Sequence, residues 1–303
     1  MATGQAIGVL GAQAEEVLLR RSRPLLPRML RLLRQNPLGA LGLIIVVILL
    51  TVAIFAPLIA PYGVGEYTAG QPRENPSLHH LFGTDGIGRD MFSRVVFGAR
   101  ISMSVAFLSV IGGTLIATVV GIISGYMGGV VDNAIQRSVD TALAFPQLLL
   151  LLILASVLHP SFSTVVIAIM IGIIAPVARI VRGAVLSEKN NQYVEAARAL
   201  GASTPRILFV HIAPNIVALA IIVATTLLGL AILAEASLSF LGLGIPVPNP
   251  SWGTDISLAR TTLPFHLPWA FFPGLAITLT VLAFNLLGDS LRDIFDPRLR
   301  GRL

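Results

Sequence analysis

Long apolar runs, separated by short polar segments, dominate the pattern of hydrophobic and polar positions along the chain. A hydrocarbon core is crossed by roughly 20 apolar residues of helix, and six runs approach or exceed that length. The predicted spans are 38–60, 101–125, 141–158, 164–183, 215–235 and 269–288. None of these runs alternates apolar and polar residues as the strands of a membrane β-barrel do. The pattern therefore predicts an all-α integral membrane protein with six transmembrane helices.

Two of these runs allow a second interpretation. The run 141–158 is short and contains Pro146, so it can also form a re-entrant hairpin with the fourth run; six separate spans is the preferred interpretation. The run 38–60 follows basic residues, as a signal peptide would. Its 23 residues exceed the apolar part of a signal peptide, about 7–15 residues, and Pro61 makes a poor cleavage junction. We expect an uncleaved first span.

The distribution of basic residues predicts the orientation. With the N-terminus in the cytoplasm, 16 of the 21 Lys and Arg residues fall in inner segments and five in outer ones, as the positive-inside rule requires. We therefore expect four regions. They are a cytoplasmic tail 1–36 with an interfacial helix at 20–36, a first span and outer loop 37–100, a five-helix core 101–290 with a short cytoplasmic helix at about 191–203, and a cytoplasmic tail 291–303.

Composition supports a lipid environment. Hydrophobic residues make up 55% of the chain and charged residues 12%, against about 25% charged in soluble domains. The net charge of +6 fits basic cytoplasmic loops better than nucleic-acid binding. Cysteine is absent, which excludes disulfides and thiolate chemistry.

Catalytic and ion-coupled functions find little support. A P-loop needs a glycine-rich segment before its lysine, and the only lysine, Lys189, lies in "LSEKNNQ". The five histidines form no metal-binding motif, and there is no G-x-S-x-G elbow. Ionisable residues are nearly missing from the centres of the spans, which argues against an ion-coupled carrier. A membrane channel remains the alternative, since prolines and glycines in the spans can line a pore.

A short polar stretch between the fourth and fifth runs stands out. It reads "EAARALGASTPRILFVHIAPN", residues 195–215. Its alanines favour helix, and Gly201 stands where a helix ends in a left-handed residue. Ser203 or Thr204 can then cap a second helix that has Pro205 in its first turn. This spacing predicts a short cytoplasmic helix that can dock another protein; an ordinary inter-helix loop is the alternative.

The stretch resembles the coupling motif of ABC importer permeases, E-A-A, three residues, G, nine residues, then I-x-L-P. Glu195, Ala196, Ala197, Gly201 and Pro214 match the motif, whereas its I and L positions hold His211 and Ala213. The resemblance implies that an ATPase subunit couples to the stretch. The residues expected to carry this contact are Glu195, Ala196, Ala197, Arg198, Gly201 and Pro214.

Three further segments resemble one permease subunit of the dipeptide, oligopeptide and nickel importers. They are "FGTDGIGRDMFSRVVFGARISM", "EASLSFLGLGIPVPNPSWG" and "LGDSLRDIFDPRLR", and the likeness runs from about residue 31 to residue 300. The resemblance implies the type I ABC importer permease fold and half of a translocation path for peptides or nickel chelates.

The same resemblance implies the partners and the location. The expected partners are a second, homologous permease, two cytoplasmic ATPases and an extracytoplasmic solute-binding protein. ATP and Mg²⁺ belong to the ATPases, so this chain needs no cofactor or metal and is no enzyme by itself. The expected location is the bacterial or archaeal plasma membrane, with both termini in the cytoplasm.

The segment "GTDGIGRD" allows two interpretations. Thr84, Asp85, Arg89 and Asp90 can gate or receive solute at the outer face. The preferred interpretation is a tight turn, capped by Asp85, in which Gly86 and Gly88 take positive φ.

Overall fold

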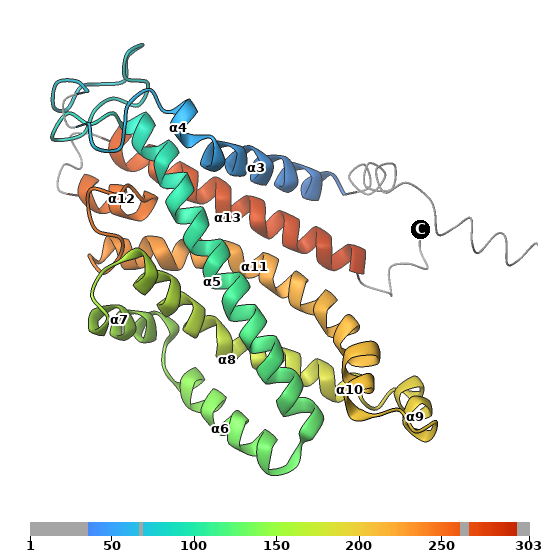
Figure 1. The fold of residues 1–303 in the computed structure, drawn as a ribbon. Coiled ribbons are helices and arrows are strands. Elements are labelled where there is room, and N and C mark those ends of the chain that lie inside the picture. Colours follow the sequence, from blue (N-terminus) through green and yellow to red (C-terminus); the bar gives the residue numbers. More distant parts are fainter. Residues whose placement is uncertain (1–35, 67–68, 261–266, 296–303) are drawn as a thin grey trace, which may run out of the picture.

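The fold is built from long helices, most of which run side by side (Figure 1). The computed structural model describes residues 36–66, 69–260 and 267–295. Over these residues it contains helices and a single isolated bridge between Thr84 and Asp90. The elements are α3 (Pro37–Ile54), α4 (Ala56–Ile59), α5 (Met91–Met127), α6 (Gly129–Ala144), α7 (Gln147–Val157), α8 (Phe162–Glu188), α9 (Gln192–Ala199), α10 (Thr204–Arg206), the π-helix η1 (Ile207–Ile212), α11 (Ala213–Phe240), α12 (Trp252–Ala259) and α13 (Pro268–Phe295).

The helices confirm the all-α membrane fold, but the number of single helices that can span a membrane differs from the prediction. In the described part of the chain, five helices are long and apolar enough to cross a membrane, or six if the bent pair α6 and α7 forms one span. The predicted tail helix in residues 20–36 lies almost entirely outside the described residues, as does most of the predicted C-terminal tail.

The predicted third span, 141–158, is wrong as a single helix. The chain bends by 91° between α6 and α7. Phe145, with φ −85° and ψ 135°, is extended, as the ring of Pro146 favours for the residue before it. The 11 residues of α7 extend only about 16 Å, which is too short to cross a bilayer alone.

Most helices are longer than their apolar runs. Helix α5 begins at Met91 rather than at 101, because the side chain of Asp90 accepts a hydrogen bond from the Ser93 N–H at 2.8 Å and caps the helix. Helices α10, η1 and α11 continue without a break over Thr204–Phe240. The segment between the fifth and sixth predicted spans contains α12, which Ser251 caps by accepting from the Thr254 N–H. This helix was not predicted from the sequence.

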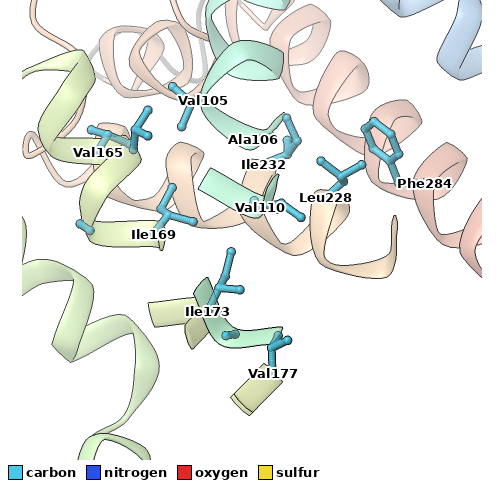
Figure 2. Close-up of a cluster of buried hydrophobic side chains, with 14 of the residues drawn as sticks. Val105, Ala106, Val110, Val165, Ile169, Ile173, Val177, Leu228, Ile232 and Phe284 are labelled. Atoms are coloured by element: carbon cyan, nitrogen blue, oxygen red, sulfur yellow. The ribbon is translucent and has the colours of Figure 1, made fainter. Parts of the chain in front are cut away.

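The hydrophobic core lies where α5 packs against α8, α11 and α13. Figure 2 shows Val105, Ala106 and Val110 of α5 facing side chains of α8, α11 and α13. Helices α5 and α8 pack closely along their length. A Cβ on Gly121 would lie 2.7 Å from the Val181 side chain, and one on Gly125 would lie 2.9 Å from that of Val185. Glycine at these two positions lets the two helices pack closely.

The arrangement separates two ends of the bundle. The start of α3, the end of α13 and helix α9 lie toward one end, and α4, α12 and the loop 69–90 lie toward the other (Figure 1). We call these the α9 end and the α12 end. The two groups of predicted site residues are therefore far apart, one at each end.

Candidate functional site

Helix α9 projects from the bundle at the α9 end (Figure 1). Val194 is fully buried in the hydrophobic core and fixes one face of the helix. Glu195, Ala196 and Arg198 lie exposed on the other faces, and Leu200, directly after the helix, is 89% exposed. A short helix with one buried residue and an exposed face of small and charged residues is suited to docking a partner.

Gly201 ends α9 as predicted. Its φ is +78°, a conformation that costs little only for glycine. The Gly201 N–H donates to the Arg198 carbonyl at 3.0 Å, and the Ala202 N–H donates to the Ala197 carbonyl at 3.0 Å. This pair of bonds is the Schellman motif. It turns the chain sharply toward α10, whose first turn contains Pro205.

The π-helix η1 explains how Pro214 is accommodated in a continuous helix. Proline has no N–H, and its ring clashes with the carbonyl four residues earlier. The widened turn of η1 comes directly before it, and there the Ala213 N–H donates to the Leu208 carbonyl. Ile207 and Ile212 remain buried in the core. His211 and Ala213, where the chain departs from the coupling motif, thus lie in or beside a turn whose packing is intact.

Three side chains that the sequence analysis did not select join α9 to the spans on either side. The Tyr193 hydroxyl donates to Glu188 Oε1 at the end of α8. Asn215 Nδ2 of α11 donates to Glu188 Oε1 at 2.6 Å and to the Tyr193 hydroxyl at 3.0 Å. We call Glu188, Tyr193 and Asn215 the inner node. Partial burial and the bond to Glu188 raise the pKa of Tyr193, so its hydroxyl stays protonated.

Several other charged residues of α6 and α8 are paired or hydrogen-bonded. Asp132 is 8% exposed, and Arg182 Nε donates to its Oδ1 at 2.6 Å. Asp140 pairs with Arg179. Lys189 Nζ donates to the Gly125 carbonyl at 2.8 Å, near the end of α5. These contacts tie α5, α6 and α8 together where they meet the polar region.

At the α12 end, the "GTDGIGRD" segment forms a buried turn. Asp85 Oδ1 accepts from the N–H groups of Ile87 and Arg89, at 3.0 and 2.9 Å, and Asp85 Oδ2 accepts from Arg89 Nε at 2.5 Å. The Thr84 hydroxyl donates to the Gln71 carbonyl. Gly88 has positive φ as predicted. The same prediction for Gly86 is wrong, because Gly83 takes this role with φ +76°.

Asp90 completes this turn and begins α5. It accepts hydrogen bonds from both the N–H and the hydroxyl of Ser93 at 2.8 Å, and His80 Nδ1 lies 3.0 Å from its Oδ1. Thr84, Asp85, Arg89 and Asp90 are all less than 10% exposed. Their side chains are used in holding the loop, which supports the interpretation as a structural turn.

A buried ion pair that the sequence analysis missed attaches α12 to α5. Arg94 Nε donates to Asp255 Oδ1 at 2.8 Å, and these residues are 4% and 2% exposed. Burial raises the pKa of the Asp255 carboxyl, and the guanidinium of Arg94 opposes this shift. A cavity of about 250 Å³ borders the pair. No local signal links two residues so distant in sequence.

A second buried contact joins the same elements. Glu235 of α11 is fully buried and accepts hydrogen bonds from the hydroxyls of Ser102 at 2.9 Å and Ser239 at 2.8 Å. The Trp252 N–H donates to the Ser102 hydroxyl at 3.3 Å, and its indole N–H donates to the Val95 carbonyl at 2.9 Å. Helix α12 is thus fixed to α5 and α11. Among the described residues, no three potential ligands gather to hold a metal ion.

Comparison with known proteins identifies the family to which the chain belongs. Residues 117–301 match the family described as binding-protein-dependent transport system inner membrane component. Residues 25–76 match the N-terminal TM domain of oligopeptide transport permease C. The chain therefore belongs to the permease family of the ABC importers. It is a multi-pass membrane permease subunit, and in such transporters ATP hydrolysis belongs to separate ATPase subunits rather than to the permease.

Individual relatives agree over most of their length. The dipeptide transport system permease protein DppC of Alkalihalophilus pseudofirmus is 42% identical over 88% of each chain. The oligopeptide permease OppC of Bacillus subtilis is also 42% identical over 88% of each. The glutathione permease GsiD of Pectobacterium atrosepticum is 42% identical over 89% of this chain and 90% of its own. The crystal structure of an amino acid ABC transporter with histidines shares the fold, with a TM-score of 0.51 and 19% identity, over 66% of this chain and 94% of that one.

Proposed function

We propose that this chain forms half of the translocation path of an ATP-driven importer of small peptides. The observation that carries the proposal is α9, with Val194 buried and Glu195, Ala196 and Arg198 exposed, in a chain of the importer permease family. In this proposal two ATPases dock at the α9 ends of this chain and of a second, homologous permease. A binding protein delivers solute to the α12 end.

The solute class follows from the relatives. The three relatives described above are named for dipeptide, oligopeptide and glutathione transport, and glutathione is itself a small peptide. Peptides are therefore preferred over nickel chelates. Uptake of labelled di- and tripeptides into vesicles containing the permease pair, the ATPases and the binding protein tests the solute class. Uptake of nickel chelates with no uptake of peptides would overturn it.

The proposal that ATP is hydrolysed by separate subunits gives a direct prediction. The purified permease chain alone is expected to hydrolyse no ATP, because its only lysine, Lys189, lies outside any glycine-rich phosphate loop. Hydrolysis is expected only when the ATPase subunits are added. Mg²⁺-dependent phosphate release by the single chain, at a rate that follows its concentration, would contradict the proposal.

The proposed orientation places the α9 end in the cytoplasm. Ser77 and Ser187 are both exposed, one in each end region, and the natural chain contains no cysteine. In intact cells, an impermeant thiol reagent is expected to label Ser77→Cys and to leave Ser187→Cys unlabelled until the membrane is opened. The reverse pattern would invert the topology.

A further inference from the structure

We infer that Tyr193 is a positioning residue that passes movement of α9 to two membrane spans at once. The inference rests on the proposed function, because it takes α9 as the docking site of an ATPase. It adds a residue outside the coupling motif. The Tyr193 hydroxyl both donates to Glu188 of α8 and accepts from Asn215 of α11.

The geometry of the inner node supports a directional link. Asn215 Nδ2 also lies 2.6 Å from Glu188 Oε1, so the three polar groups form a closed triangle between three helices. The ring of Tyr193 lies against that of His211 of η1, with the centroids 6.1 Å apart. Because hydrogen bonds depend on direction as well as distance, the triangle fixes the rotation of α9 about its own axis.

The apolar contact of α9 has a different effect. Val194 is fully buried and holds the helix against the core, but packing of this kind has little directional preference. Two short connections, 189–191 and 200–203, join α9 to α8 and α10. The hydroxyl of Tyr193 is therefore the contact that sets the angle at which the exposed face of α9 meets a partner.

The link continues into the bundle. Glu188 is the last residue of α8, and the next residue, Lys189, donates from Nζ to the Gly125 carbonyl of α5 at 2.8 Å. On the other side, Asn215 lies in the first turn of α11, and its Nδ2 also donates to the His211 carbonyl at 3.2 Å. A rotation of α9 thus acts on α8 and α11 directly, and on α5 through Lys189.

The test uses the full complex of both permeases, the ATPases and the binding protein, reconstituted in lipid vesicles. Tyr193→Phe removes the hydroxyl and keeps the ring, and Asn215→Leu removes the amide at similar volume. Each is expected to keep normal co-purification of the ATPases and to lower the peptide transported per ATP hydrolysed by about fivefold or more. The double variant is expected to be no worse than either single one, because both act on one triangle.

Two further variants separate positioning from general stability. Glu188→Gln keeps one acceptor oxygen for Tyr193 and Asn215, replaces only the oxygen that accepts from Asn191 Nδ2 at 3.0 Å, and is expected to retain most of the coupling. Tyr126→Phe removes the hydroxyl of another tyrosine, at the α9 end of α5, and is expected to match the wild type. Wild-type transport per ATP in Tyr193→Phe, additive losses in the double variant, or failure of Tyr193→Phe to assemble would each overturn the inference.

Failure of the proposed function gives a different result. If no ATPase cross-links to the cysteine of Leu200→Cys in a complex that is otherwise wild type, the docking proposal itself is wrong. If ATPases bind there and transport is normal in Tyr193→Phe, only the role of the inner node is wrong.

Discussion

Gly201→Val is expected to abolish ATP-driven transport while the permease still inserts in the membrane. Gly201 has φ +78°, and a β-branched residue in this conformation is strained by about 1–3 kcal/mol. A Cβ at this position would meet nothing within 4 Å, so the effect comes from the backbone alone. Relief of the strain opens the Schellman turn and redirects the exposed face of α9.

The measurement is co-purification of the ATPase subunits, together with solute-stimulated ATP hydrolysis in vesicles. Gly201→Asn is the matched control, because asparagine tolerates the left-handed conformation far better than valine does; it is expected to keep most of the activity. Glu195→Arg tests the same surface by reversing an exposed charge, and like charges placed together at an interface oppose binding. Glu195→Gln should fall between Glu195→Arg and the wild type. Normal assembly and activity in both Gly201→Val and Glu195→Arg would show that α9 is an ordinary connection.

Arg94→Met is expected to be the most destabilising single change at the α12 end. It leaves the buried carboxylate of Asp255 without its guanidinium, and breaking a buried ion pair from one side costs about 3–5 kcal/mol. Removing both charges in Arg94→Met with Asp255→Leu is expected to restore most of the loss, since no buried charge remains. The thermal transition of the detergent-solubilised permease pair measures both effects.

The destabilisation in Arg94→Met is expected to depend on pH. Burial already raises the pKa of Asp255 against the effect of Arg94, and loss of the guanidinium raises it further. A group with a raised folded-state pKa favours the folded state below its unfolded pKa and loses that contribution as pH rises through the folded pKa. Arg94→Met should therefore be closest to wild-type stability in acid. A stability difference that does not vary with pH, or a double variant as unstable as the single one, would contradict this account.

The sequence predicted those features that depend on local chemistry. The end of α9 at Gly201 follows from a helix-favouring alanine stretch followed by glycine, and five of the six apolar runs coincide with single helices long enough to cross a membrane. These features depend on a few neighbouring residues, and their physical causes can be seen in a short window.

Features that depend on distant partners were missed. The pairing of Arg94 with Asp255 and that of Asp132 with Arg182 join residues on separate helices, and no periodicity indicates which charges will meet. The inner node was not predicted, because Glu188, Tyr193 and Asn215 come together only when α8, α9 and α11 pack against one another. Helix α12 was not predicted because it is too short for a span and its cap, Ser251, follows three prolines in a loop-like segment.

The unbroken helix from Thr204 to Phe240 has a mechanical consequence. Its 37 residues extend about 55 Å, and they carry Asn215 near one end and Glu235 near the other. The helix packs on α5 and α13, and near its far end Glu235 accepts a hydrogen bond from Ser102 of α5. One continuous element therefore connects the inner node at the α9 end with the buried polar contacts at the α12 end. A displacement of Asn215 along the helix axis reaches Glu235 without crossing a loop.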